Sequence, residues 1–151
     1  MSSFNWPFIG PIKQSFAAKQ FCYNLGLLIS NGVPVMRALQ TLEKTETNTQ
    51  TKTMYVNMID GLKNGRSLSE LCREITWLPT TSKRLVTMGE KTGKLGDTLL
   101  AASTILENKN KDMIRKLSRI LTPALTLITG LIIGLIVISV LSAILSINDF
   151  A

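Results

Sequence analysis

The hydrophobic positions of this chain follow two patterns, which meet near residue 119. Before that point apolar residues recur every three or four positions, as in Phe21, Leu25 and Leu28, which is the period of a helix buried on one face. After it, the run from Ile120 to Ile147 contains no charged residue. At a rise of about 1.5 Å per residue, this run exceeds the roughly 30 Å hydrocarbon core of a bilayer. It predicts a transmembrane helix, because it is too long for a core helix and lies at the wrong end for a signal peptide.

Turn and capping residues divide the first part of the chain into six predicted helices. Three sites have the sequence of a left-handed helix end: Asn31-Gly32, Asn64-Gly65 and Gly93. Pro34 suits the first position of the second helix, where its missing N–H costs nothing. The polar run 45–53 predicts the loop that follows this helix. Ser67 and Glu70 have the types and spacing of a capping box.

These helices predict an all-α fold, an antiparallel six-helix bundle whose last helix continues into a single transmembrane helix. The sixth helix begins near Leu95 and meets no stop signal before the apolar run, although Pro123 is expected to bend it. The chain then divides into an N-terminal lead-in segment (1–11), a cytoplasmic helical bundle (12–119), the transmembrane helix (120–147) and a periplasmic tail (148–151).

The first helix carries a second apolar stripe besides its inner face. Phe16, Tyr23 and Leu27 lie on another side of that helix. This pattern leaves two alternatives, a helix buried in the centre of the bundle or a surface shared with a partner.

Basic residues just before the apolar run indicate its orientation. Five of them face a single acid, Asp112, and they are Lys109, Lys111, Arg115, Lys116 and Arg119. An excess of Lys and Arg marks the cytoplasmic side of a span, and it also suits anionic lipid headgroups. Most of the chain is therefore expected to be cytoplasmic, beside membrane lipid.

Composition argues against several chemistries. The net charge is +7, but no basic stripe is interleaved with aromatic residues, so we expect no nucleic-acid partner. The chain has no histidine, which excludes a Ser-His-Asp triad and a His-ligated zinc site. Cys22 and Cys72 form no CxxC pair and are expected to be reduced packing residues. We expect no catalytic residue, no cofactor and no metal, although Glu70 and Glu74 leave a carboxylate pair as an alternative for an enzyme.

The segment Gly89-Glu90-Lys91-Thr92-Gly93-Lys94-Leu95 looks at first like a nucleotide-binding P-loop. A P-loop needs four residues between its first Gly and Gly-Lys, then Ser or Thr, and it follows a strand. Here three residues intervene, Leu95 follows, and the flanking segments are helical. The sequence instead predicts close helix approach at Gly89 and a helix end at Gly93. Glu90 is either a buried, paired carboxylate that fixes the turn or an exposed contact for a partner.

Three motifs in order resemble one protein family. The turn Gly32-Val33-Pro34-Val35, the turn Gly65-Arg66-Ser67-Leu68-Ser69 and the segment 89–95 precede a long helix and a hydrophobic span. This order is similar to that of the F-type inner-membrane platform proteins (GspF/PilC-like) of bacterial type II secretion and type IV pilus systems. The resemblance covers about residues 7–149 and fits the C-terminal half of such a protein, which usually has two bundles and three spans.

The resemblance implies a function in the bacterial inner membrane. A platform protein of this family would be a scaffold, not an enzyme, that couples a hexameric assembly ATPase to pilin or pseudopilin subunits. Other inner-membrane components and further copies of the chain would be partners. Glu90, Arg66 and Arg73 are the candidate partner contacts, although solvated helix surface is the alternative for both arginines. A membrane-anchored subunit of another transport complex and a membrane-anchored enzyme are the rival functions.

Small residues recur every four positions within the predicted span. Gly130 and Gly134 form a GxxxG motif. Such motifs let two helices approach closely inside a membrane, although small residues are common in spans. We therefore expect this face to pack against another transmembrane helix.

Overall fold

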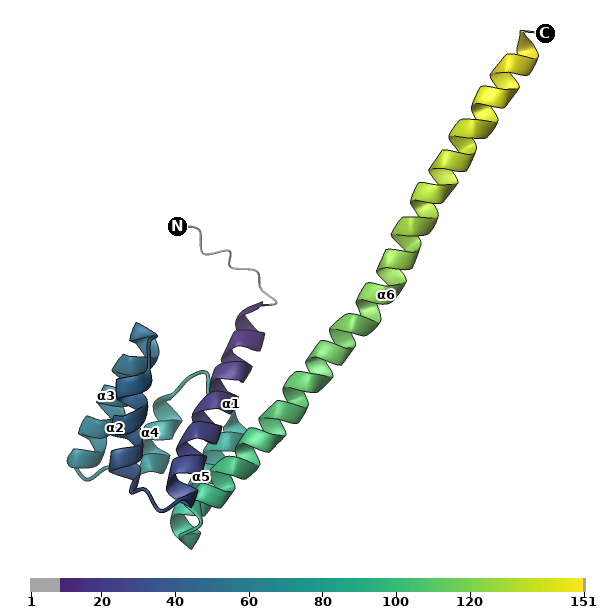
Figure 1. The fold of residues 1–151 in the computed structure, drawn as a ribbon. Coiled ribbons are helices and arrows are strands. Elements are labelled where there is room, and N and C mark those ends of the chain that lie inside the picture. Colours follow the sequence, from purple (N-terminus) through teal and green to yellow (C-terminus); the bar gives the residue numbers. More distant parts are fainter. Residues whose placement is uncertain (1–8, 151) are drawn as a thin grey trace. The chain divides into compact units, whose positions relative to one another are not determined.

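The computed structural model of the chain describes residues 9–150, in which all regular structure is helical (Figure 1). The helices are α1 (Ile9–Ser30), α2 (Val35–Thr45), α3 (Thr49–Lys63), α4 (Leu68–Glu74), α5 (Thr80–Thr92) and α6 (Leu95–Asp149). The prediction of an all-α fold with six helices is confirmed. Residues 1–8 of the expected lead-in segment and Ala151 of the expected tail lie outside the described residues.

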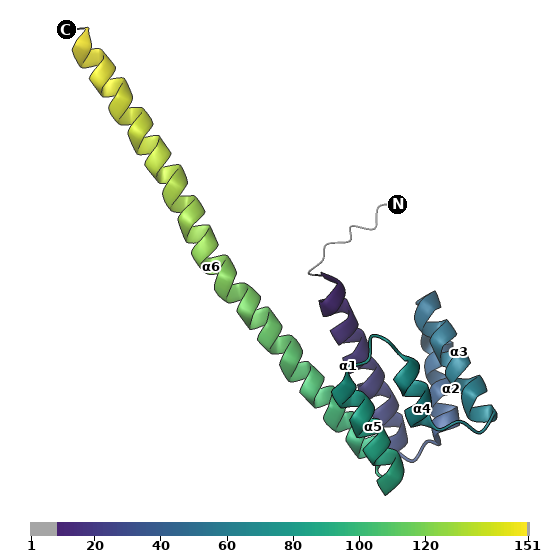
Figure 2. The same cartoon turned by 180° about the vertical axis from the view of Figure 1, so that it is seen from behind.

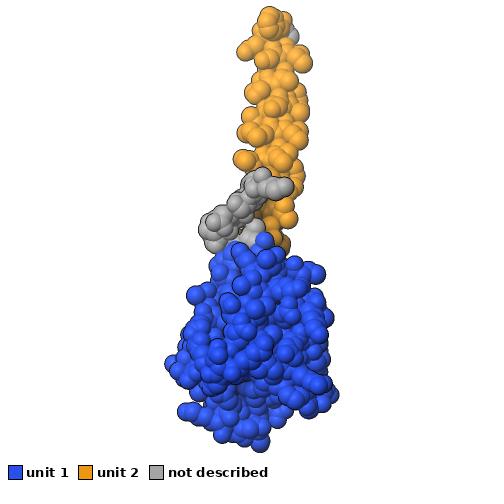
Figure 3. All heavy atoms as spheres, turned by 90° about the vertical axis from the view of Figure 1, so that its left-hand side faces the viewer, with its two compact units in different colours: residues 1–110 blue, residues 111–151 orange. Residues whose placement is uncertain are grey.

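The chain divides into two compact units, residues 1–110 and residues 111–151 (Figure 3). In the first unit each helix from α1 to α4 packs against the next one along the chain. Figures 1 and 2 show from opposite sides that these helices alternate in direction, as their short connections require. The boundary between the units falls inside α6, after Asn110.

The core of the first unit consists of the apolar side chains that the helical period brings to the inner face of each helix. Phe21, Leu25, Leu39 and Leu99 are its largest fully buried aliphatic and aromatic side chains. Burying one such side chain contributes about 1.5 to 3 kcal/mol. Each of the six helices or its flanking turn contributes to this core, so the first unit buries most of its large apolar side chains.

Glycines allow the first part of α6 to run closely along α1. A Cβ built on Gly26 would lie 2.9 Å from Leu99 Cβ and 3.0 Å from the Leu100 backbone nitrogen. On α6, a Cβ on Gly96 would lie 2.7 Å from the Ser30 backbone nitrogen. Any side chain at these positions would force the two helices apart.

A buried polar pair joins the same two helices further along. The Ser15 hydroxyl donates a hydrogen bond to the Asn110 side-chain oxygen, and both residues are buried. Because residue 15 pairs with residue 110 and residue 30 approaches residue 96, α1 and this part of α6 are antiparallel.

Two predicted boundaries in the α2 region are wrong. Pro34 is the N-cap of α2, one position before the predicted one, because its backbone is extended with ψ of 146° and its carbonyl accepts the first helical hydrogen bond, from the Ala38 N–H. The run 45–53 is not all loop, since α3 begins at Thr49. Asn48 starts that helix by accepting from the backbone N–H groups of Gln50 and Thr51. A capped first turn needs no apolar residue, so hydrophobic periodicity does not reveal it.

The second apolar stripe of α1 lies on the surface of this chain. Phe16, Tyr23 and Leu27 are each more than two-fifths exposed. The alternative of a helix buried on all sides is therefore wrong for this chain alone, and the stripe is available to another surface. Lys19 lies over the Tyr23 ring, 5.5 Å from its centroid.

The second unit is the remainder of α6, with Pro123 inside the helix (Figure 3, orange). No residue from 111 to 150 is buried in this chain. Within the described residues α6 is the one helix long and apolar enough to cross a membrane. An unbroken helix pairs its backbone groups internally, which is the condition for a spanning segment in lipid, and the one exception inside it is Pro123, which has no N–H for the Arg119 carbonyl.

Candidate functional site: the three glycine turns

Three glycines end helices at one end of the first unit. Gly32, Gly65 and Gly93 have positive φ angles of 86°, 82° and 70°. They follow α1, α3 and α5, and in an antiparallel bundle these alternate connections lie at the same end, as Figures 1 and 2 show. The structure thus brings together the three motifs that the sequence singled out.

Each of these turns has the longer hydrogen bond of a Schellman motif, and the Gly32 and Gly65 turns also have its shorter one, from the glycine N–H to the carbonyl three residues earlier at 3.0 Å. The N–H groups of Val33, Arg66 and Lys94 donate to carbonyl oxygens five residues earlier, at distances of 3.1, 3.0 and 2.9 Å. A left-handed residue is needed to close this loop, and glycine adopts that conformation without strain. The predicted helix ends are confirmed at all three positions.

Gly89 is packed too closely for any side chain. A Cβ there would lie 1.9 Å from Thr98 Oγ1 and 2.9 Å from Leu95 Cα. The backbone N–H groups of Gly93 and Lys94 both donate to the Gly89 carbonyl. They are therefore not free to hold a phosphate, and this geometry supports a packing turn over a nucleotide cradle.

Glu90 links α5 to the first turn of α4. Its carboxylate accepts hydrogen bonds from the Ser69 backbone N–H at 3.0 Å and from the Ser69 hydroxyl at 3.2 Å. An acid at a helix N-terminus is favoured by the helix dipole. Glu90 is thus paired with a serine in the first turn of a helix. The residue is exposed, so the alternative of a buried, paired carboxylate is wrong in its burial.

The two candidate arginines differ in their surroundings, although both are exposed. Arg66 forms an ion pair with Glu74, and this hydrogen bond lowers the pKa of the Glu74 carboxyl. The Arg73 carbonyl accepts from Lys83 Nζ at 3.1 Å, and no ion pair is found for the Arg73 side chain among the described residues. Arg73 is therefore the less compensated positive charge. A partner role for either arginine stays a prediction.

The carboxylate pair considered for an enzyme is occupied by structural contacts. Glu70 closes the predicted capping box, in which Ser67 N–H donates to the Glu70 carboxylate at 3.3 Å and Glu70 N–H donates to the Ser67 hydroxyl at 3.2 Å. Glu74 pairs with Arg66. Both acids are exposed, on the outer side of a short helix whose inner side is buried.

The two thiols are buried packing groups. Cys22 and Cys72 are free and fully buried, and burial raises the pKa of each thiol to about 12. A thiol that stays protonated is a poor nucleophile and a poor metal ligand.

The residues that contact Glu90 and Gly89 could not be identified from the sequence. Ser69 receives Glu90, and Thr98 limits the space at Gly89. Serine and threonine at such positions also occur on ordinary exposed surface, so their type gave no signal. The two serines of the second motif were the one available hint, since Ser67 caps α4 and Ser69 receives the carboxylate.

Comparison with known proteins agrees with the order of these turns and the span that follows. Residues 21–143 match the family model described as type II secretion system (T2SS), protein F. The chain belongs to this family. The match runs from the middle of α1 into the apolar part of α6, so it includes all three glycine turns.

Curated relatives come from both type II secretion and type IV pilus systems. The type II secretion system protein F of Xanthomonas campestris is 30% identical over 133 residues, covering 88% of this chain and 33% of that protein. The type IV pilus assembly protein PilC of Myxococcus xanthus is 24% identical over 119 residues, covering 79% of this chain and 28% of the relative. The chain thus spans about a third of the length of these relatives.

Proposed function

We propose that this chain is an inner-membrane platform protein of a type IV pilus or type II secretion machine. The observation that carries the proposal is that one family match covers both the helical unit and the apolar helix, in that order. In this proposal the first unit lies in the cytoplasm, because the basic residues between Lys109 and Arg119 precede the span. The chain acts as a scaffold and not as an enzyme.

The three glycine turns are the proposed docking end for a hexameric assembly ATPase. The support is geometric. Three tightly closed turns give a partner a preorganised backbone surface, which loses little conformational entropy on binding. Arg66 would meet an acidic partner at this end, while Glu90 holds α4 and α5 in place for it. Arg73, in the last turn of α4, would meet an acidic partner away from this end. The ATPase supplies the energy, and α6 connects the docking unit to the membrane.

The apolar part of α6 is the proposed contact for membrane partners. These are pilin or pseudopilin subunits, other inner-membrane components and a second copy of this chain. Gly130 and Gly134 have open space around them, so their face can receive another helix closely.

Site-specific photo-crosslinking of the full chain in its native membrane tests the ATPase partner. The crosslinking amino acid replaces Lys94, an exposed residue at the glycine turns, and in a control it replaces Thr76, an exposed residue in the connection between α4 and α5 at the other end. We expect the assembly ATPase to be captured from position 94 and not from position 76. Capture from neither position, or from position 76 alone, would contradict the docking end.

A reporter fused after Ala151 tests the orientation. We expect activity only on the side of the membrane opposite the cytoplasm. A cytoplasmic signal would contradict the orientation and with it the ATPase contact. Nucleotide hydrolysis by the purified chain would instead favour an anchored enzyme.

A further inference from the structure

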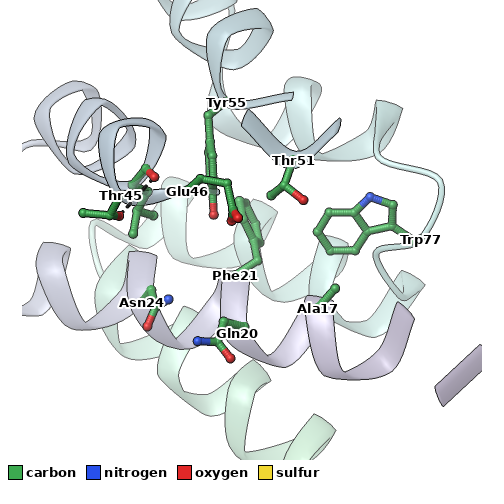
Figure 4. A pocket seen from close by; sticks show the side chains of 10 residues that line it. Ala17, Gln20, Phe21, Asn24, Thr45, Glu46, Thr51, Tyr55 and Trp77 are labelled. Atoms are coloured by element: carbon green, nitrogen blue, oxygen red, sulfur yellow. Dashed lines mark hydrogen bonds between the residues drawn. The ribbon is translucent and has the colours of Figure 1, made fainter. Parts of the chain in front are cut away.

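A hollow of about 340 Å³ lies on the first unit, away from the glycine turns. It is formed by the middle of α1, the end of α2, the start of α3 and the indole of Trp77, which precedes α5 (Figure 4). Glu46 is the one charged residue among those that line it. None of the sequence motifs and none of the proposed contacts uses this hollow.

Three aromatic rings form its base and one wall. The Phe21 and Tyr55 rings are stacked at 24° with centroids 6.2 Å apart, and the Trp77 ring stands at 90° to Phe21 with centroids 6.1 Å apart. Phe21 and Tyr55 are buried, so they form the base. Trp77 is partly exposed, and Figure 4 shows it across the hollow from Glu46. The site therefore offers an indole surface opposite a carboxylate.

The Glu46 carboxylate has no cationic partner among the described residues. One of its oxygens accepts from the Asn48 backbone N–H at 2.9 Å. The nearby Glu43 is different, since it pairs with Lys52 at 3.5 Å. Figure 4 shows the Glu46 carboxylate beside the Tyr55 hydroxyl, and the pKa of Tyr55 is raised by burial and by the charge of Glu46. The negative charge thus acts inside the hollow, in a chain whose net charge is +7.

The remaining polar lining groups include further hydrogen-bond acceptors. Gln20 and Asn24 contribute side-chain amides from α1, each with an acceptor oxygen and a donor NH2 group. The Thr45 hydroxyl donates to the carbonyls of Thr41 and Leu42, which leaves its lone pairs toward other donors. A cation with several N–H donors would pair with Glu46 and with these acceptors, whereas an anion would be repelled by Glu46 and an apolar group would leave the acceptors unpaired.

We propose that this hollow binds the guanidinium group of an arginine side chain from a partner protein. A guanidinium is planar, carries five donors in a fork that matches a carboxylate, and stacks on an indole face. The arginine stem would pass Ala17, with the guanidinium plane against the Trp77 indole and its N–H groups directed toward Glu46. A lysine would supply the charge but neither the fork nor the flat surface. The occupant is therefore an arginine-bearing segment, bound independently of the ATPase end.

Fluorescence of Trp77 in the full chain in detergent tests the proposal. The chain has two tryptophans, so Trp6→Phe makes Trp77 the single reporter. The ligand is N-acetyl-arginine amide in the millimolar range, compared with N-acetyl-citrulline amide, which has the same shape without the charge, and with N-acetyl-lysine amide. We expect a saturable change with the arginine compound, weaker binding of the lysine compound and no binding of the citrulline compound.

Two matched variants connect the binding to Glu46. Glu46→Gln keeps the acceptor for the Asn48 N–H but removes the charge, and it should weaken arginine binding about tenfold. Glu43→Gln removes a carboxylate three positions earlier, inside α2, and should change binding by less than about twofold. Equal melting temperatures of the two variants would exclude loss of folding as the cause.

Four results would overturn the proposal. They are the absence of saturable binding by the arginine compound, equal binding of the citrulline compound, equal binding of the lysine compound, and an unchanged affinity in Glu46→Gln. None of these results bears on photo-crosslinking from position 94, so the failure of this site and the failure of the ATPase contact are separate outcomes.

Discussion

Residues 9–110 and residues 111–150 are both helical, yet the first region buries most of its apolar side chains and the second exposes them. The first region places nineteen apolar residues in a buried core. In the second, large apolar side chains such as Leu131 and Leu145 are each about two-thirds exposed. Helix formation therefore does not by itself say how a segment is stabilised. The first region is held by its own packing, and the second requires another apolar phase around it.

The largest expected difference in stability between the two regions comes from truncating one large side chain in each. Phe21→Ala removes the ring that contacts Tyr55 and Trp77, and the cavity should lower the free energy of unfolding by about 3 to 5 kcal/mol. Leu131→Ala leaves no cavity, because Leu131 is 66% exposed in this chain. Thermal unfolding of the full chain in detergent, followed by circular dichroism, measures both. Equal losses would contradict the comparison.

A matched pair of glycines gives the next largest difference. Gly96→Ala places a Cβ 2.7 Å from a backbone nitrogen of α1, which cannot move like a flexible side chain, and it should cost about 1 to 3 kcal/mol. Gly130→Ala meets nothing within 4 Å, so it should leave unfolding of the first unit unchanged. Urea denaturation of the two variants in a Trp6→Phe background, followed by Trp77 fluorescence, compares them. A stable Gly96→Ala variant would mean that α6 can shift on α1.

A third pair of variants, within one turn, separates a requirement for backbone conformation from a role of the lysine side chain. Gly93 has φ of 70°, so Gly93→Val should strain the backbone and cost about 1 to 2 kcal/mol. Lys94→Ala should be near neutral, because the turn uses only the backbone N–H of Lys94. Melting temperatures and nucleotide binding of both variants distinguish the alternatives. Loss of nucleotide binding in Lys94→Ala, together with an unchanged melting temperature in Gly93→Val, would support the P-loop interpretation instead.

The same contrast explains what could be predicted from the sequence. The helix ends at Gly32, Gly65 and Gly93 were predictable, because a left-handed residue is a local requirement that depends on a few neighbours. The capping box at Ser67 and the apolar run were predictable for the same reason. Helix starts were less so, since Asn48 caps α3 in a polar run that has no hydrophobic period.

Contacts between distant residues could not be predicted. The pairs Ser15 with Asn110 and Ser69 with Glu90 join helices far apart in the chain, and each of these residue types also suits a solvated surface. The hollow at Glu46 likewise depends on where α1, α2 and α3 meet Trp77. A single sequence gives the polarity of such residues but not their partners. The order of the motifs was more informative for function, because it identified the family that the comparison confirms.

Substitutions in the GxxxG motif should have the smallest effect on folding. They test the second region alone. Gly130→Ile combined with Gly134→Ile adds two bulky side chains where open space surrounds both glycines, so insertion and the stability of the first unit should not change. If this face packs against another helix, close approach is lost, and disulfide crosslinking between copies through Leu141→Cys, which lies on the same helix face as the two glycines, should fall. Leu131→Ile combined with Leu135→Ile is the matched control, since it has the same spacing and conserves volume. Equal crosslinking yields in the two double variants would remove the packed face and leave this part of α6 as a simple membrane anchor.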